Sequence, residues 1–336
     1  MQGLYNVSSN PHARGRMTTN HIMCAVALAL LPAALFGVFN FGWRALLVLV
    51  LSAGSSVLFE YLFERALKKP VTIRDGSALV TGLLIGMNMP AGVPLWMPVL
   101  GSAFAIIIVK QLYGGLGQNF MNPALAARAF LMISFAGYMT DFSVGSGFRG
   151  WVDAATGATP LAVLKAGGTP PLANLFFGTT QGTIGETSAL LLLLGAAALV
   201  ILGVIRLRIP VAYLCSFSVF AFIARLASGG GADFRYLLSE LLSGGLMLGA
   251  WFMATDYVTS PVTKRGQWLY GCFLGVLTAI LRLYGSSAEG VSYAILIGNL
   301  VVPVIERFTR PTAFGKGGKK HVAAYRRGRA REPHGA

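Results

Sequence analysis

Charged residues are scarce in this chain. Asp, Glu, Lys and Arg make up 12% of its 336 residues, whereas a soluble domain usually carries about 25%. A soluble fold of this size needs a polar surface, which this composition cannot supply. Apolar residues make up 55% of the chain and lie in stretches long enough to cross a bilayer. The composition therefore predicts an integral membrane protein.

Cysteines and motifs for nucleotide chemistry are also scarce. Cys24, Cys215 and Cys272 lie in different apolar stretches, and none belongs to a C-x-x-C pair. This spacing argues against a zinc site, a dithiol centre or an iron–sulfur cluster held by this chain alone. Small apolar packing residues are the ordinary interpretation, although one cysteine can still join a site shared between subunits. The chain has no P-loop, so ATP-driven transport is not expected. It also has no convincing acid–base triad.

Stretches without charge predict an all-α fold with about ten transmembrane helices. The expected ranges are 20–39, 43–63, 75–90, 94–112, 122–140, 186–205, 209–228, 236–256, 266–284 and 288–306. Lys and Arg gather in alternate connections and at the C-terminal end, so the positive-inside rule places both termini in the cytoplasm. The long loop 141–185 is then extracytoplasmic.

The loop divides the predicted helices into two sets of five. The organisation is a cytoplasmic segment 1–19, a repeat 20–140, the external loop 141–185, a repeat 186–306 and a basic cytoplasmic tail 307–336. An odd number of helices in each set requires the two sets to point oppositely, as inverted repeats do. The tail suits anionic lipid or a partner subunit, and nucleic acid is not an expected partner.

Faint internal similarity supports the repeat. Gln111–Gly114 resembles Arg282–Gly285, and Thr81–Met87 resembles Gly244–Ala250. The second pair is rich in glycine and falls in the third helix of each set. Such glycines either break a helix beside a central pathway or only allow close helix packing, and the sequence does not choose between these roles.

The external loop carries a pattern of a different kind, D-x-x-[ST]-G-A-[ST]. Its residues here are Asp153, Thr156, Gly157, Ala158 and Thr159. The pattern resembles the acceptor motif of flavin transferases, which attach FMN to the last Ser or Thr through a phosphoester. Gly157 and Ala158 carry almost no side chain, so the Thr159 hydroxyl is open to a bulky donor. Asp153 is expected to bind the metal of the transferase or to orient the hydroxyl.

Four segments together resemble one family. They are Ser9–Arg14 with Thr18–Met23, the central Gly114–Ala124, the flavin-acceptor loop, and Ser243–Asp256. The chain resembles the D subunit of Rnf-type ion-translocating ferredoxin:NAD⁺ oxidoreductases and, next to it, the B subunit of Na⁺-translocating NADH:quinone reductase. The short segment before the first helix favours the Rnf type. Ser9–Pro11 and Asp256–Tyr257 depart mildly from the expected forms.

The resemblance implies a urea-transporter-like bundle in the bacterial inner membrane, within a complex of several subunits. It implies covalent FMN at Thr159, attached by a flavin transferase, and a noncovalent riboflavin between helices. Asn119 and Asn122 are three residues apart and are the riboflavin candidates. The alternative is that they cap the helix that begins near Pro123.

The function implied is a flavin-carrying subunit that is not catalytic alone. The complex couples electron transfer between ferredoxin and NAD to the translocation of Na⁺ or H⁺. Ionisable residues near the spans are candidates for the ion path, namely Glu60, Arg128, Glu240, Asp256 and Glu306. Asp256 is the first of these, and Arg128 is expected to pair with a carboxylate or a cofactor. The alternatives are the quinone-reductase type of subunit, a small-solute channel without redox chemistry, or a purely structural membrane anchor for other subunits.

Overall fold

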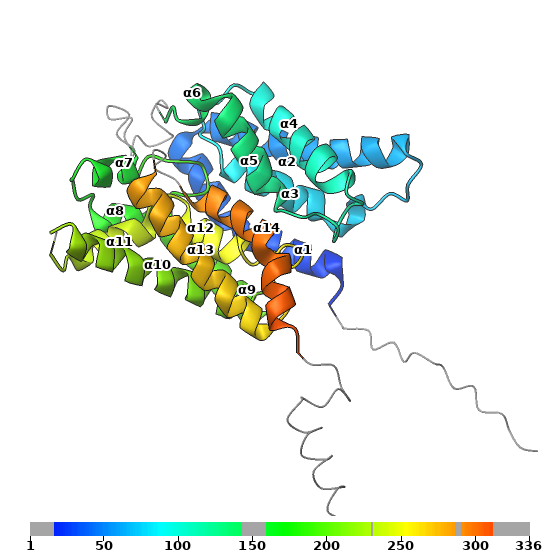
Figure 1. The fold of residues 1–336 in the computed structure, drawn as a ribbon. Coiled ribbons are helices and arrows are strands. Elements are labelled where there is room, and N and C mark those ends of the chain that lie inside the picture. The colour runs from blue at the N-terminus through cyan, green and yellow to red at the C-terminus, as the bar shows by residue number, and fades with distance from the viewer. Residues whose placement is uncertain (1–16, 143–158, 230, 286–289, 312–336) are drawn as a thin grey trace, which may run out of the picture.

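The computed structural model describes residues 17–142, 159–229, 231–285 and 290–311. Within these ranges every regular element is a helix, which confirms the predicted all-α class (Figure 1). The segment before residue 17 and the tail from residue 312 lie outside the described part.

Eight helical segments precede the long loop. They are α1 (Thr19–Phe41), α2 (Trp43–Ala66), η1 (Ile73–Asp75), α3 (Ser77–Met87), α4 (Trp96–Ala103), the π-helical η2 (Phe104–Gln111), α5 (Pro123–Ser134) and α6 (Ala136–Met139). The loop region holds α7 (Pro160–Lys165) and α8 (Leu172–Phe177). The second half contains α9 (Ala189–Ile201), α10 (Arg208–Ala227), α11 (Phe234–Leu242), α12 (Leu246–Leu248), the π-helical η3 (Gly249–Met253), α13 (Lys264–Tyr284) and α14 (Val291–Thr309).

The ten ranges predicted from the sequence each overlap an observed helix or a run of helices. Among the described residues, five helices are long and apolar enough to cross a bilayer, namely α1, α2, α10, α13 and α14. A sixth span results if α11 and the α12–η3 segment, which meet at a bend of 64°, are taken together. The other apolar helices have 10–17 residues, short of the roughly 20 that a straight span requires. The count of ten spans therefore stays a prediction.

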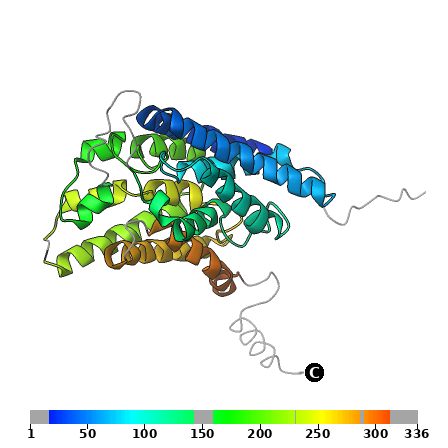
Figure 2. The ribbon, with the colours of Figure 1, turned by 90° about the horizontal axis from the view of Figure 1, so that it is seen from above.

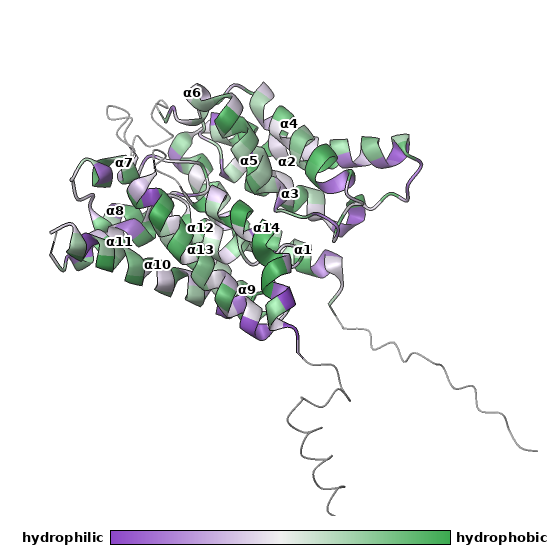
Figure 3. Cartoon of the chain, viewed as in Figure 1, coloured by the Kyte–Doolittle hydropathy of each residue, from purple (hydrophilic) through white to green (hydrophobic). Residues whose placement is uncertain are grey.

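Apolar side chains cover the outer surface of the helices. Leu35 of α1, Leu194 of α9 and Ile223 of α10 are each 58% exposed. Figure 3 shows hydrophobic residues along the helix bodies, while hydrophilic ones are more frequent toward the helix ends. Such surfaces are unfavourable in water and suit lipid. The chain is therefore a multi-pass membrane protein.

The two glycine-rich segments behave differently. Gly82 and Gly86 lie within the unbroken helix α3, where added Cβ atoms would lie 2.5 Å from the Ser52 carbonyl oxygen and 2.4 Å from Ser52 Oγ. These glycines allow close packing of α3 on α2. Gly244 and Gly245 both have positive φ angles and form the break between α11 and α12. One segment therefore allows close helix packing, and the other breaks a helix.

The halves of the chain lie side by side. In both views α2, α3 and α4 lie mainly on one side and α10, α11 and α13 on the other, while α1 packs on α9 (Figures 1 and 2). The segment before α9 also joins the halves, because the Ile184 and Gly185 amides donate to the carbonyls of Met89 and Met87 at 3.0 and 2.8 Å. These contacts bring the connections that follow α3 and η3 toward one central region.

Candidate functional site

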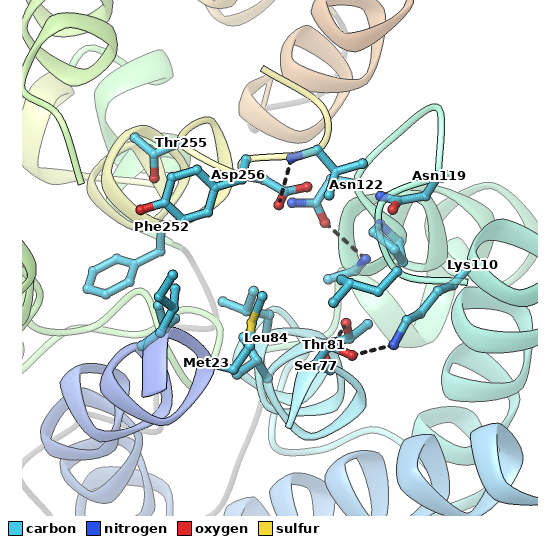
Figure 4. Close-up of a pocket in the computed structure, with 18 of the residues that line it drawn as sticks. Met23, Ser77, Thr81, Leu84, Lys110, Asn119, Asn122, Phe252, Thr255 and Asp256 are labelled. Atoms are coloured by element: carbon cyan, nitrogen blue, oxygen red, sulfur yellow. Dashed lines mark hydrogen bonds between the residues drawn. The ribbon is translucent and has the colours of Figure 1, made fainter. Parts of the chain in front are cut away.

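A cavity with about 780 Å³ of free space lies between the two halves, and we call it the interhelical cavity (Figure 4). Its wall includes apolar residues of α1 and α3 and the η3 residue Phe252. Its polar side chains include Ser77, Lys110, Asn119, Asn122, Thr255 and Asp256. Ligand pockets typically have mostly apolar walls and a few placed polar groups, and the lining of this cavity has the same character.

The structure brings Asn119 and Asn122 together in this wall, but their local roles differ. Asn122 is the N-cap of α5, and its Oδ1 accepts hydrogen bonds from the amides of Ala124 and Leu125 at 3.0 and 3.3 Å. The capping alternative is thus confirmed for Asn122. Asn119 does not cap the helix, and its Nδ2 donates to the Met121 carbonyl at 3.1 Å.

Asp256 also lines the interhelical cavity, in the connection beyond η3 and outside the helical segments. Its carboxylate accepts a hydrogen bond from Thr259 Oγ1 at 3.0 Å. Burial raises the pKa of this carboxyl above the ordinary value of 3.8, and the bond from Thr259 opposes the rise. No cationic side chain pairs with Asp256 in the described part of the chain. The position therefore suits a group that takes up a cation or a proton.

Lys110 is a site residue that sequence reasoning missed. Its Nζ lies 2.6 Å from Glu60 Oε1 and donates to Ser77 Oγ at 2.6 Å. Glu60 is 0% exposed, so it lies in the protein interior. A signal for this core was present, because Ser52, Ser56, Glu60 and Glu64 follow one another at intervals of four residues on α2 and are all buried.

Thr159 stands at the N-cap of the short helix α7. It is half-buried, and its Oγ1 accepts one long hydrogen bond, from the Ala162 amide at 3.3 Å. Among the described residues, this hydroxyl makes no other hydrogen bond. Asp153, Thr156, Gly157 and Ala158 lie outside the described residues.

A small cavity adjoins this threonine. Thr159, Leu161, Glu186, Ser243 and Gly244 are among its lining residues, and it has about 310 Å³ of free space. We call it the Thr159 cavity. It brings the acceptor residue against the break between α11 and α12.

Arg128 and Glu186 form a buried ion pair beside the same break. Arg128 Nη1 lies 2.9 Å from Glu186 Oε1 and 2.6 Å from Asn88 Oδ1. Both charged side chains are nearly inaccessible, at 6% and 4% exposure. The predicted pairing of Arg128 with a carboxylate is confirmed. Sequence reasoning missed Glu186 as its partner, although this residue begins the predicted range 186–205.

Arg282 forms the second buried cluster. Its guanidinium donates to the carbonyls of Glu240, Ser243 and Gly244 at 2.7, 2.9 and 2.7 Å and lies 3.4 Å from Glu240 Oε2. It thus closes the C-terminal end of α11. Glu240 is therefore an internal partner and not an interfacial carboxylate. The remaining candidate, Glu306, accepts from the Val262 amide at 3.0 Å.

Metal-ligand clusters of three or more His, Cys, Asp or Glu are absent among the described residues. The three cysteines are unpaired and exposed. They lie on faces of α1, α10 and α13 that point away from the core.

Comparison with known proteins identifies relatives along nearly the whole chain. The model of the NQR2, RnfD, RnfE family matches residues 6–315. The D subunit of the Na(+)-translocating ferredoxin:NAD(+) oxidoreductase complex of Acetobacterium woodii is 48% identical over 314 residues, covering 92% of this chain and 95% of that protein. The D subunit of the proton-translocating ferredoxin:NAD(+) oxidoreductase complex of Clostridium ljungdahlii is 42% identical over 327 residues, covering 94% and 97%. The D subunit of an ion-translocating oxidoreductase complex of Stutzerimonas stutzeri is 38% identical over 349 residues, covering 92% and 96%.

Proposed function

Since the chain belongs to the NQR2, RnfD, RnfE family, we propose that it is the flavin-carrying membrane subunit of an Rnf-type complex. The complex couples electron transfer between ferredoxin and NAD to translocation of Na⁺ or H⁺. The names of the relatives support the assembly and leave the ion open, since one is called Na⁺-translocating and another proton-translocating. The subunit is not catalytic alone and works with the other subunits.

Thr159 carries the flavin part of the proposal. It is the last residue of the acceptor pattern, and its half-buried hydroxyl has one long hydrogen bond. A flavin transferase attaches FMN to this oxygen. The bound flavin supplies one-electron transfer, while the protein fixes its position and tunes its potential.

A second, noncovalent flavin, riboflavin, occupies the interhelical cavity. The mixture of apolar wall and amide groups supports this assignment. The side-chain amides of Asn119 and Asn122 face the ligand, and Asp256 belongs to the ion path beside it.

The topology is ten spans in two inverted five-helix repeats in the bacterial inner membrane. The cytoplasmic termini and the extracytoplasmic Thr159 loop follow from the distribution of Lys and Arg. Bent and short helices are tolerated in a membrane where neighbouring protein satisfies their backbone groups, and this supports counting α3, α9 and the α11–η3 pair among the spans.

The mass of the intact subunit, purified from its native host, tests the proposal. We expect an FMN adduct that peptide mapping places at Thr159, and a fluorescent band after denaturing electrophoresis. Thr159→Val removes both signals, while Thr169→Val, in the same loop but outside the acceptor pattern, is the matched control that keeps the acceptor hydroxyl. A colourless wild-type chain of unmodified mass would favour a small-solute channel of the same fold. Unchanged turnover of the complex after Thr159→Val would favour a purely structural anchor.

A further inference from the structure

A continuous row of buried side chains connects the interhelical cavity to the Thr159 cavity. Asn122 lines the first cavity, and its Nδ2 donates to the Met253 carbonyl at 3.3 Å. Met253 Sδ lies 3.9 Å from Asn88 Nδ2, and Asn88 Oδ1 accepts from Arg128 at 2.6 Å. Arg128 in turn contacts Glu186, which lines the second cavity. The row places a charged pair between the residues that line the two cavities.

The order of the two charges along this row is fixed. Arg128 lies on the side of Asn88 and Asn122, whereas Glu186 is the member that reaches the Thr159 cavity. The surroundings leave little room for rearrangement, because a Cβ at Gly245 would lie 2.3 Å from Glu186 Oε1. An arginine stays protonated in proteins. A cation that leaves Asp256 toward the Thr159 cavity therefore meets a permanent positive charge before it meets the carboxylate.

We propose that Arg128 is the electrostatic barrier that prevents passive cation flow between the interhelical cavity and the Thr159 cavity. An arginine in a narrow path excludes cations in other membrane pores by the same physics. Glu186 and Asn88 hold the guanidinium in the path, so they act as positioning residues. This inference rests on the proposed function only in assuming that a cation crosses through this chain, and it does not depend on the flavin at Thr159.

Passive leak of the intact complex tests the barrier. The complex is reconstituted into liposomes loaded with ²²Na⁺, and release is followed without any electron donor, with proton leak followed by an internal pH dye. We expect Arg128→Gln to raise cation leak at least tenfold over the wild type. Arg128→Lys keeps the charge and stays within about twofold of the wild type. Arg208→Gln removes a half-buried arginine that donates to Gln267 and lines neither cavity, and it leaves the leak unchanged.

Glu186→Gln separates electrostatics from damaged packing. It removes the carboxylate of the pair and keeps the positive charge of Arg128, so cation leak stays at or below the wild-type level. A packing defect would instead raise the leak in Arg128→Gln and Glu186→Gln alike, and that outcome overturns the proposal. An Arg128→Gln complex that folds and leaks no more cation than the wild type overturns the proposal as well.

If a single variant fails to assemble, the double variant Arg128→Gln/Glu186→Gln provides the test instead. Removal of both partners avoids an unpaired buried charge, and the neutral path is expected to leak cations more than the wild type. A double variant that leaks no more cation than the wild type contradicts the proposal. Because the leak is measured without electron donors, its result does not depend on the FMN adduct. The mass of the intact subunit tests for that adduct separately.

Discussion

Leu161 packs against Gly244 so closely that a Cβ on Gly244 would lie 1.9 Å from Leu161 Cδ1. Leu161 follows Thr159 by two residues, and Gly244 lies in the break between α11 and α12, with φ of +63°. The short helix that begins after the acceptor threonine is therefore anchored on the broken helix of the second half. The position of any group attached to Thr159 depends on this contact.

Gly244→Ala tests the anchor. The left-handed backbone alone costs a residue other than glycine about 1–2 kcal/mol, and displacement of Leu161 adds about 1–3 kcal/mol. We expect the free energy of unfolding, measured by SDS titration in mixed micelles, to fall by roughly the sum. Gly203→Ala is the matched control, because Gly203 has φ of +72° and no atom within 4 Å of its added Cβ. Equal losses in the two variants would show that Leu161 is not held there.

Arg282→Met is expected to destabilise the fold strongly. The guanidinium satisfies the carbonyls of Ser243 and Gly244 and faces the Glu240 carboxylate, so its removal leaves buried acceptors and an unpaired charge. Breaking a buried pair in this way costs about 3–5 kcal/mol. The same titration measures the loss, and Arg235→Met on the exposed face of α11 serves as control, with a change within about 0.5 kcal/mol. A loss for Arg282→Met no larger than that of the control would contradict the assigned role.

Helix positions were predictable because residues that face lipid must be apolar whatever their neighbours are. The cap at Asn122 was also readable, since an Asn followed by Pro is a local signal. Side-chain pairs between residues far apart in the sequence could not be predicted. Lys110 and Glu60 lie far apart in the sequence, and no local rule joins them. Only half of the Arg128–Glu186 pair could be predicted, because an arginine in an apolar helix requires a partner but the sequence does not identify that partner.

Asn119 and Asn122 can be separated by the kind of substitution. Asn122→Ala removes the cap of α5. We expect it to lower the free energy of unfolding by about 1 kcal/mol and also to weaken riboflavin binding. Asn122→Ser keeps an oxygen at the cap and loses the amide nitrogen with its hydrogen bond to the Met253 carbonyl, so most of the stability is retained while affinity falls. Asn119→Ala has no cap to lose. Flavin fluorescence titration beside SDS unfolding measures both quantities. Unaltered affinity in Asn122→Ser and Asn119→Ala would remove these residues from the flavin site.

Asp256→Asn is expected to change how stability depends on pH. Burial raises the pKa of this carboxyl in the folded chain above its ordinary value of 3.8. The folded state then binds more protons than the unfolded state between those two pKa values, so wild-type stability falls as pH rises through that window. The Asn variant has no proton to lose. Its thermal midpoint relative to the wild type is therefore expected to start near zero below the unfolded pKa and to become positive above it.

Thr259→Val provides the matched comparison for this carboxyl. Thr259 Oγ1 donates to Asp256 Oδ2 at 3.0 Å and stabilises the ionised form. Its loss raises the pKa of Asp256 further, so the fall in stability extends to higher pH than in the wild type. Midpoints measured by differential scanning fluorimetry in buffers from acid to neutral pH distinguish the three chains. A difference between Asp256→Asn and the wild type that stays constant with pH would show that Asp256 titrates as an ordinary surface carboxyl, which would remove the main electrostatic argument for a cation or proton at this position.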